Sequence, residues 1–302
     1  MIDELVITPA ADEIPADRAL SERAAPASFA QAVADAGAIG ERFRLSIAGF
    51  SDGDLQSADG IGDDALQGLV AARGKGLGTS EPRVAATLFL QAYAYRIAAP
   101  GLALWVQSGL VPDMSASNLL LRFDAEGRPI EVYLRDPVVF SDRSFTLPDA
   151  NVRAVPDLTS QAVESILIQH LLPLHDRLRV LYRLGPLLAK GAVASQIGMA
   201  LTFIDANTTV AWRDVAATAV AFFNASRDQI EGQGRTGDMI VKRLGELEGT
   251  TWRRRTCCLV YQAPERDYCG GCPIRKEPDR NATWARRLQN RSTRSTTDEI
   301  KR

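Results

Sequence analysis

The sequence predicts a single α+β domain that is mostly helical, with a small antiparallel sheet and a separate cysteine-bearing segment near its end. Three observations carry this prediction. Long stretches have apolar residues at three- and four-residue spacing, two short alternating runs flank a turn sequence, and all four cysteines lie within residues 257–272. With 302 residues, 46% of them apolar, the chain can bury one large core or two modest ones.

The first predicted elements are a strand, a broken helix and a hairpin. The segment RFRLSIAGF, residues 42–50, alternates well enough for a strand. Residues 82–108 have helical periodicity, and we expect a break near Pro100. The two alternating runs around the turn sequence DAEG, residues 124–127, predict a β-hairpin.

Helices are predicted for most of the chain that follows. Apolar residues recur with helical spacing over residues 159–184, 186–204 and 211–227, and a further helix is expected over residues 237–248. No internal repeat or heptad run interrupts this order. The composition changes near Gly249, where the chain becomes basic and contains the cysteines.

The N-terminal sequence and the most apolar stretch both favour a cytoplasmic protein without stable membrane insertion. The first twenty residues have acidic side chains where a signal peptide has basic ones. Residues 85–107 are strongly apolar but contain Arg96 and Pro100, which suits a core helix pair better than a membrane span. In the cytosol thiols stay reduced, and a tight group of cysteines more often binds metal than forms disulfides.

The charge is divided unevenly along the chain. Residues 251–302 contain 13 Lys and Arg against 6 Asp and Glu, a net charge of +7, so residues 1–250 carry −9 of the total of −2. A basic segment of this kind can bind nucleic acid or surround an anionic inorganic centre. The composition predicts a body over residues 1–250, a cysteine-containing region over 251–280, and a partly disordered basic tail over 281–302.

The cysteines follow the pattern Cys257-Cys258-x10-Cys269-x2-Cys272, with a proline directly after the last. Four thiolates complete the shell of a structural zinc ion or of a 2Fe-2S cluster. Adjacent residues in an extended strand point to opposite sides, so a vicinal pair reaches one ion only if the backbone turns sharply. Two irons offer a wider target, and structural zinc sites usually separate paired cysteines by two to four residues.

This pattern, preceded by basic residues, resembles the 2Fe-2S signature of the FhuF-type ferric-siderophore reductases. The order of elements over residues 80–276 is similar too, in the stretches QAYAYRIAAPGLALWVQSGLVPD, LRDP and QHLLPLHDRLR. One departure concerns a turn at the start of a helix. Members of that family commonly have a Trp-Gly-Asn-like turn where this chain has Lys190-Gly191-Ala192.

The resemblance implies a cytosolic one-electron oxidoreductase for iron acquisition, which reduces ferric siderophores and releases the iron as Fe(II). Its cofactor would be a 2Fe-2S cluster bound by Cys257, Cys258, Cys269 and Cys272, and the body over residues 1–250 would bind the siderophore. The reaction needs no acid, base or nucleophile, so no catalytic side chain is expected beyond the cluster. The expected partners are the ferric siderophore and an electron donor such as a ferredoxin or a flavin- or NAD(P)H-dependent reductase, with no nucleic acid.

Two further sets of residues near the cysteines are candidates for supporting roles. Arg253, Arg254 and Arg255 would stabilise the negative charge of a reduced cluster, or attract an anionic donor or ferric chelate; the alternative is a solvated face. Gly270 and Gly271 would let backbone N–H groups approach sulfur at conformations that other residues resist; the alternative is a simple tight turn.

The aromatic residues beside the cysteines and the two histidines are expected to be structural. Trp252 and Tyr268 flank the cysteines and would shield a cluster from water. His170 and His175 are the only histidines, and on a straight helix their spacing places them roughly 140° apart, by 3.6 residues per turn. They are therefore poor partners for one metal ion.

Two interpretations from other functional classes remain open. One is a zinc-stabilised binding module whose four cysteines and basic tail contact nucleic acid. The tail lacks interleaved aromatic residues, however, and the acidic body would repel phosphate. The other is an iron-sulfur sensor that responds to redox state without a substrate. An absorption spectrum separates colourless zinc from red-brown iron-sulfur protein.

Overall fold

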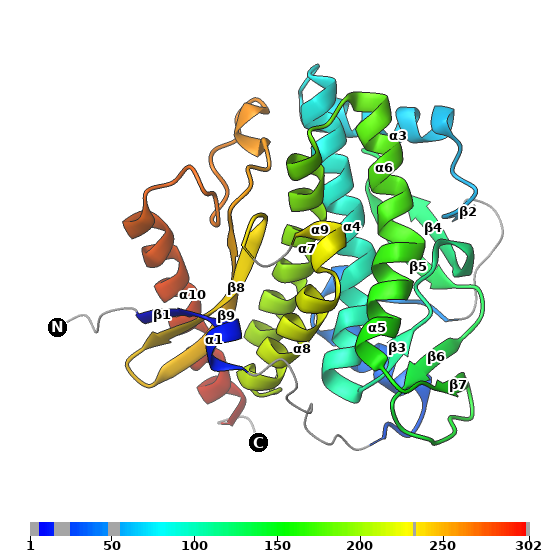
Figure 1. Cartoon of the computed structure of the whole chain (residues 1–302), viewed down its shortest axis with the longest axis vertical. Helices are drawn as coiled ribbons and strands as arrows, with labels where there is room; N and C mark the ends of the chain where they lie inside the picture. Colours follow the sequence, from blue (N-terminus) through cyan, green and yellow to red (C-terminus); the bar gives the residue numbers. More distant parts are fainter. Residues whose placement is uncertain (1–5, 15–24, 48–54, 232–233, 300–302) are drawn as a thin grey trace.

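The computed structural model describes residues 6–14, 25–47, 55–231 and 234–299, with side chains as far as residue 289. The predicted class is confirmed, because the structure is mostly helical with small antiparallel and mixed sheets. Helices surround the long central helix α4 (Pro82–Ser108), and a β-hairpin covered by the C-terminal helix lies beside them (Figure 1).

Helix α4 is the centre of the core, and nearly all its side chains are buried. It begins after Glu81, which accepts a hydrogen bond from the Arg83 N–H, and it ends at Gly109, whose φ is 68°. The predicted break at Pro100 is wrong, because the helix continues through this residue. Burial against several helices stabilises α4 enough to offset the hydrogen bond that Pro100 cannot donate.

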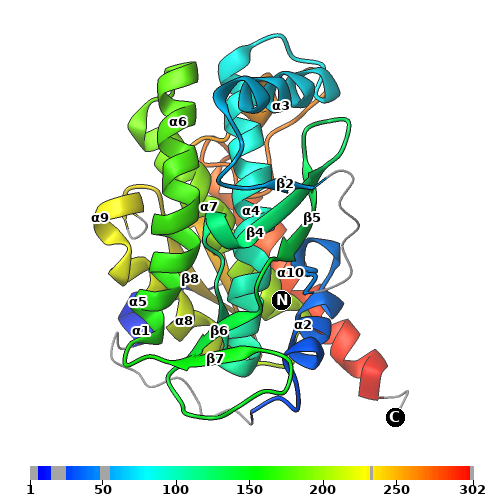
Figure 2. The same ribbon diagram turned by 90° about the vertical axis from the view of Figure 1, so that its right-hand side faces the viewer.

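The helices that pack around α4 come from both sides of it in the sequence. The predictions for residues 159–184, 186–204 and 211–227 are confirmed, although the first of these regions contains a π-helical stretch, η3. Figure 2 shows α6 on one side of α4 and the β4–β5 hairpin on the other. The helices are α1 (Ala10–Glu13), α2 (Phe29–Ala38), η1 (Glu41–Phe43), α3 (Asp63–Gly76), η2 (Ala116–Asn118), α5 (Leu158–Ala162), η3 (Val163–Leu171), α6 (Leu172–Tyr182), α7 (Pro186–Asn207), α8 (Trp212–Ala225), α9 (Arg227–Ile230), η4 (Val260–Gln262) and α10 (Glu277–Glu299).

Within the described ranges, the strands form three small sheets, ordered β1-β8-β9, β2-β4-β5 and β3-β6-β7. All pairs are antiparallel except β6 with β7. The strands are β1 (Val6–Pro9), β2 (Gln56–Ser57), β3 (Val111–Pro112), β4 (Leu119–Phe123), β5 (Pro129–Leu134), β6 (Val138–Ser141), β7 (Asn151–Ala154), β8 (Gly237–Leu244) and β9 (Leu247–Arg254).

The hairpin predicted around residues 124–127 is confirmed as β4 and β5. Its turn is fixed by Asp124, whose carboxylate accepts hydrogen bonds from the N–H groups of Glu126 and Arg128 at 2.9 Å each. Gly127 has a φ of 70°, a conformation that favours glycine. This turn lies against α3, where a Cβ on Gly127 would approach the carbonyl carbon of Leu69 to 3.1 Å.

The strand predicted for residues 42–50 is wrong over its described part. Residues Glu41–Phe43 form the short helix η1, and Ser46 makes a single bridge to Tyr133 beside β5. Phe43 and Leu45 are buried in the core, so two apolar side chains at alternating positions have the spacing of a strand without belonging to one. Residues 48–50 lie outside the described residues.

The helix predicted for residues 237–248 is also wrong, because this region forms strand β8, the turn and the start of strand β9. Gly245, with a φ of 59°, lies in the tight turn between the two strands. Almost every residue of β8 is buried on both faces, with α7 and α8 on one side and α10 on the other. Burial on both faces removes the alternating pattern by which a strand is recognised in a sequence.

The segment predicted as a partly disordered tail from residue 281 is helical as far as Glu299. Trp284 and Leu288, four residues apart, are buried where α10 packs on β9. The C-terminal helix therefore covers the outer face of the β8–β9 hairpin (Figure 1). By length and composition α7 is apolar enough to cross a membrane, but 67% of its most apolar stretch is buried inside the protein, as in a core helix.

Candidate metal centre

The cysteine segment, residues 255–276, follows strand β9 and folds over the N-terminal part of α4 (Figure 1, orange). A small apolar cluster holds it there. Leu77, Val84 and Leu88 pack against Ala263, with Leu259 and Val260 at the edge of the cluster. The segment is thus fixed to the helical body by side chains that lie between the second and third cysteines.

All four cysteines are free thiols in this segment. Cys258 and Cys272 are buried, Cys257 and Cys269 are half-buried, and the sulfur atoms of Cys258 and Cys269 lie 3.7 Å apart and share a hydrogen bond. Within the part of the chain that the structure describes, no three His, Cys, Asp or Glu side chains gather closely enough to hold one metal ion.

A left-handed residue turns the chain directly after the vicinal pair. Leu259 has a φ of 63°, and its N–H donates to the Cys257 sulfur at 3.3 Å. Strand β9 ends at Arg254, and the chain changes direction at Leu259, directly after the vicinal pair. Gly270 and Gly271, in contrast, have ordinary backbone angles, so the conformations expected of them are not adopted.

The thiols differ in their affinity for protons. The hydrogen bond shared with the Cys269 thiol, helped by nearby Arg254 and the Val260 N–H, lowers the pKa of Cys258. The same hydrogen bond, with burial, raises the pKa of Cys269, and burial raises that of Cys257. Thiolates are the form in which cysteine binds metal, and the surroundings of Cys258 favour that form.

The three arginines before the cysteines point in two directions. Arg253, in β9, and Arg255, directly after it, point to the same side, where they donate to the Asp238 carboxylate at 3.0 and 2.8 Å. Arg254 lies on the other face; it is buried, and its charge acts on Cys257, Cys258 and Cys269. Strand alternation thus brings one of the three arginines to the thiols.

Two polar groups beside the cysteines are buried without a partner. Among the described residues, Arg254 Nη2 and Thr256 Oγ1 have no hydrogen-bond acceptor or donor opposite them. The other nitrogens of Arg254 are used, since Nε donates to the Thr256 carbonyl at 2.8 Å and Nη1 to Gln91 Oε1 at 3.4 Å. Donors left free next to sulfur ligands are the groups that would stabilise a negatively charged metal cluster.

The aromatic residues that flank the cysteines, and His170, have packing or hydrogen-bond partners of their own. Trp252 is buried in the core and stacks on Phe223 with ring centroids 4.6 Å apart, whereas Tyr268 is 39% exposed and packs on Tyr261. His170 is structural: its Nδ1–H donates to the Met114 carbonyl and its Nε2 accepts from the Tyr93 hydroxyl, both at 2.7 Å. Burial lowers the pKa of His170 to about 4, so the ring is neutral.

His175 has a different partner and a different environment from His170. Its Nδ1 lies 3.0 Å from an oxygen of the Asp176 carboxylate, while its Nε2 is buried with no hydrogen-bond partner among the described residues. Burial lowers the pKa of His175 as well. Neither ring joins the cysteines in a group that could hold a metal ion.

Gly191 lets helix α7 approach the cysteine segment closely. A Cβ at this position would lie 2.6 Å from the Cβ of Thr256, the residue directly before Cys257. About two turns further along the same face of α7, a Cβ on Gly198 would lie 2.6 Å from Cγ of Trp252. The glycine of the Lys190-Gly191-Ala192 sequence thus has a packing role, which its place within a helix had hidden.

A cavity of about 350 Å³ opens beside the cysteine segment, within the usual size range of ligand sites. Residues of one face of α4, the hairpin β4–β5 and η1 line it. Gln91 joins the cavity to the thiols, because its side chain lines the cavity and its Nε2 donates to the Cys258 carbonyl at 3.4 Å. Its Oε1 also accepts from Gln196 Nε2 at 3.1 Å, and Gln196 lines the same cavity.

Neither Gln91 nor the cavity was expected from the sequence. The signal that could have found the cavity is Arg96, a charged residue in the most apolar stretch of the chain, which lines it. A charge kept inside an apolar helix usually has a purpose that packing does not explain.

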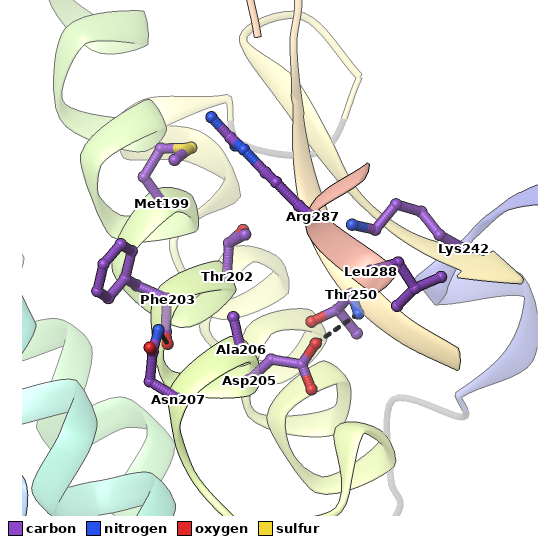
Figure 3. A pocket seen from close by; sticks show the side chains of 10 residues that line it. All are labelled: Met199, Thr202, Phe203, Asp205, Ala206, Asn207, Lys242, Thr250, Arg287 and Leu288. Atoms are coloured by element: carbon purple, nitrogen blue, oxygen red, sulfur yellow. Dashed lines mark hydrogen bonds between the residues drawn. The ribbon is translucent and has the colours of Figure 1, made fainter. Parts of the chain in front are cut away.

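A second cavity, of about 280 Å³, lies between α7, the β8–β9 hairpin and α10 (Figure 3). Met199 and Phe203 of α7 lie on one side of it, with Lys242, Arg287 and Leu288 across from them. No cysteine lines it. The carboxylate that lines this cavity, that of Asp205, accepts a hydrogen bond from the Thr250 N–H at 2.8 Å.

Comparison with known proteins identifies two parts of the chain. Residues 87–189 match the family described as Ferric iron reductase FhuF-like transporter, and residues 254–273 match the FhuF 2Fe-2S C-terminal domain. The search of curated proteins finds no match. The two matched regions contact each other, since Gln91 donates to the Cys258 carbonyl and Leu88 packs against Ala263.

The residues present fit a 2Fe-2S cluster. Four free thiols are the number that such a cluster requires, and they are accompanied by a buried arginine with an unpartnered N–H group and by backbone N–H groups directed at sulfur. The matched regions and this donor set agree on one assignment. The chain belongs to the FhuF-like ferric iron reductase family and carries the FhuF 2Fe-2S C-terminal domain.

Proposed function

We propose that this protein is a cytosolic reductase of ferric siderophores, in which the cavity beside α4 seats the chelate and Cys257, Cys258, Cys269 and Cys272 hold the cluster. The observation that carries the proposal is the position of Gln91. Its side chain lines the cavity and also contacts the backbone of Cys258, so a chelate in the cavity and the cysteines are separated by one residue.

The chemistry of release follows from the two oxidation states of iron. Siderophores hold Fe(III) through hard oxygen donors, and one added electron gives Fe(II), which these donors hold more weakly. A 2Fe-2S cluster supplies electrons one at a time when it is bound. The protein's own residues have to keep the chelate near the cysteines and restrict the access of water to them.

Several residues serve these two needs. Leu88 faces the cavity and also packs in the apolar cluster that holds residues 259–263 on α4, so it closes the space between the two sites. Gln196 holds the Gln91 side chain in place from α7. The buried Arg254 stabilises negative charge at the thiols, which makes it easier for the site to accept an electron.

A separate donor has to restore the electron. Cys257 and Cys269 are half-buried, so the cysteine segment has sulfur atoms near the protein surface where a ferredoxin or a flavin- or NAD(P)H-dependent reductase could approach. Cysteines grouped as metal ligands are typical of a reducing compartment, which is why we place the protein in the cytosol in this proposal.

The proposal is tested by mixing chemically reduced protein with ferric siderophores under anaerobic conditions, in the presence of a colorimetric Fe(II) chelator. The cluster should be reoxidised, and one Fe(II) should appear for each cluster that had been reduced. A cluster that stays reduced while no Fe(II) is released would instead indicate a redox sensor without this substrate.

A further inference from the structure

The cavity beside Cys258 is unusually rich in arginine. Four arginines line it, against a single carboxylate, that of Glu41 at the exposed rim. The arginines are Arg42, Arg73, Arg96 and Arg128. Because arginine keeps its charge and offers several donors in a plane, such a lining favours ligands with anionic oxygen atoms.

Two of these arginines already have carboxylate partners. Arg128 Nε lies 2.7 Å from an oxygen of Asp124, and Arg73 Nη1 lies 3.7 Å from an oxygen of Glu126. These two pairs belong to the hairpin turn and its contact with α3. Their positive charge is therefore largely compensated within the protein.

The other two have no carboxylate within 4.0 Å among the residues that the structure describes. Arg96 donates only to backbone carbonyls, from Nε and Nη2 to Ile130 at 3.4 and 3.3 Å and from Nη1 to Arg42 at 3.3 Å. The Arg42 guanidinium lies over the ring of Tyr95, 5.4 Å from its centroid. Both arginines line the cavity without a direct carboxylate partner, and the nearest carboxylates that act on Arg96 are those of Glu41 and Glu131, beyond ion-pair distance.

Arg96 is the more unusual of the two because it is only 5% exposed. Burial lowers its pKa to about 10, so it remains charged at neutral pH. A buried charge that is not directly paired with a carboxylate is costly, and an anionic ligand would recover part of that cost on binding. Arg96 lies on the face of α4 that lines the cavity. This face also contains, at three- and four-residue spacing, Leu88, Gln91, Ala92 and Tyr95.

Arg96 lies five residues beyond Gln91, which is about 7.5 Å along the axis at 1.5 Å per residue. An anion bound at Arg96 would thus sit little more than one helical turn from the side chain that contacts Cys258. The flat guanidinium of Arg42 and the ring of Tyr95 add a surface on which an aromatic arm can stack.

We infer that this cavity selects ferric chelates with a net negative charge, such as triscatecholates, over neutral trishydroxamates, and that Arg96 and Arg42 are the selecting residues. The inference rests on the proposed function, since it names the substrate class of the same site. Three catecholates carry twice the negative charge that neutralises Fe(III), whereas three hydroxamates just neutralise it. The remaining charge is what the two unpaired arginines would recognise.

Binding and reduction can be measured separately by using Ga(III), which has a charge and size close to those of Fe(III) and is not reduced under these conditions. Isothermal titration of the cluster-loaded protein with Ga(III) triscatecholate and Ga(III) trishydroxamate gives the two affinities. The wild type should bind the anionic chelate at least tenfold more tightly. Raising the salt concentration should reduce that preference.

Variants identify the residues responsible. Arg96→Gln and Arg42→Gln should each weaken binding of the anionic chelate about tenfold or more and leave the neutral chelate unchanged, as loss of a charge-assisted contact implies. Arg135→Gln, an exposed position directly after β5 that does not line the cavity, should change neither affinity. Arg42 is exposed, so its variant remains informative if the Arg96 variant folds poorly.

The inference is overturned if the wild type binds both chelates equally or prefers the neutral one, or if the cavity variants weaken both chelates alike. These results are independent of electron transfer. If the reduced wild type transfers no electron to either ferric chelate, the proposed function fails, whatever the Ga(III) affinities are. If it reduces the trishydroxamate and Ga(III) binding shows no charge preference, the function holds and the selectivity does not.

Discussion

Adding one methyl group at Gly191 should disturb the cysteine segment from a helix that contains no cysteine. In the Gly191→Ala variant the new Cβ would lie 2.6 Å from the Cβ of Thr256 and 2.7 Å from its Cγ2. Ordinary contacts between such carbon atoms begin at about 3.4 Å, so Thr256 and α7 must separate by roughly 1 Å. Thr256 precedes Cys257, and this shift is therefore passed to the first cysteine.

The expected change in the free energy of unfolding is small because two effects oppose each other. Overpacking of this kind costs about 1–3 kcal/mol. Replacing glycine by alanine inside a helix returns about 1 kcal/mol. The net destabilisation of Gly191→Ala should therefore be about 0–2 kcal/mol, and the decisive measurement is the cluster's spectrum and reduction potential rather than stability.

Two other glycines provide matched controls. Gly198→Ala, on the same helix, forces Trp252 away instead of Thr256 and should lower stability without altering the cluster. Gly68→Ala, on an exposed face of α3 with no atom within 4 Å of the new Cβ, should raise the free energy of unfolding by about 0.4–1 kcal/mol. Denaturant titration followed by circular dichroism gives the stabilities, and an anaerobic redox titration of the loaded protein gives the potential.

A second substitution tests the contact itself. Thr256→Gly removes every side-chain atom that the new methyl group would meet. The cluster spectrum of the Gly191→Ala/Thr256→Gly protein should therefore resemble that of Thr256→Gly alone more than that of Gly191→Ala alone. The reasoning is refuted if Gly191→Ala leaves the spectrum and potential as unchanged as Gly198→Ala does.

Two other predictions concern a buried histidine and a buried arginine. The pKa of His170 is lowered to about 4 in the folded protein, so as the pH falls below about 6.5 the unfolded chain binds a proton that the folded one does not. The free energy of unfolding of the wild type should therefore fall by about 3 kcal/mol between pH 6.5 and pH 4, relative to that of His170→Gln. Parallel pH profiles of the two proteins would contradict this. Removing the charge in Arg254→Gln should lower the cluster's reduction potential by roughly 40–90 mV, from an interaction of about 1–2 kcal/mol, while Arg254→Lys retains most of it. Arg253→Gln, whose partner Asp238 keeps Arg255, is the control and should not change the potential; equal shifts in Arg254→Gln and Arg253→Gln would reject the special role of Arg254.

The parts of the fold that could be predicted from the sequence are those with one buried face and with turn or helix-breaking residues at their ends. The hairpin around residues 124–127 and the three helices after residue 158 have such patterns. The β8–β9 hairpin could not be predicted, because helices cover both of its faces and its residues do not alternate. Pro100 was misleading for a similar reason, since its cost to the helix is offset by burial that only the assembled core provides.

Part of the candidate site could be predicted from the sequence, and part could not. The cysteine spacing is local, so the family and its cofactor could be predicted from it. The cavity is not local: it combines α4 with η1 and the β4–β5 hairpin, which meet only in the folded protein. The three arginines before Cys257 were predicted to act alike, but strand alternation directs Arg254 to the thiols and its two neighbours to Asp238.

The ligand assignment is tested most directly by iron and acid-labile sulfide analysis of anaerobically purified protein, together with four single Cys→Ser variants. Two irons and two sulfides per chain are predicted for the wild type, with a loss of both in every variant. A variant at Cys257, Cys258, Cys269 or Cys272 that keeps the full complement and an unaltered spectrum, or a wild type that holds zinc without sulfide, would contradict the account.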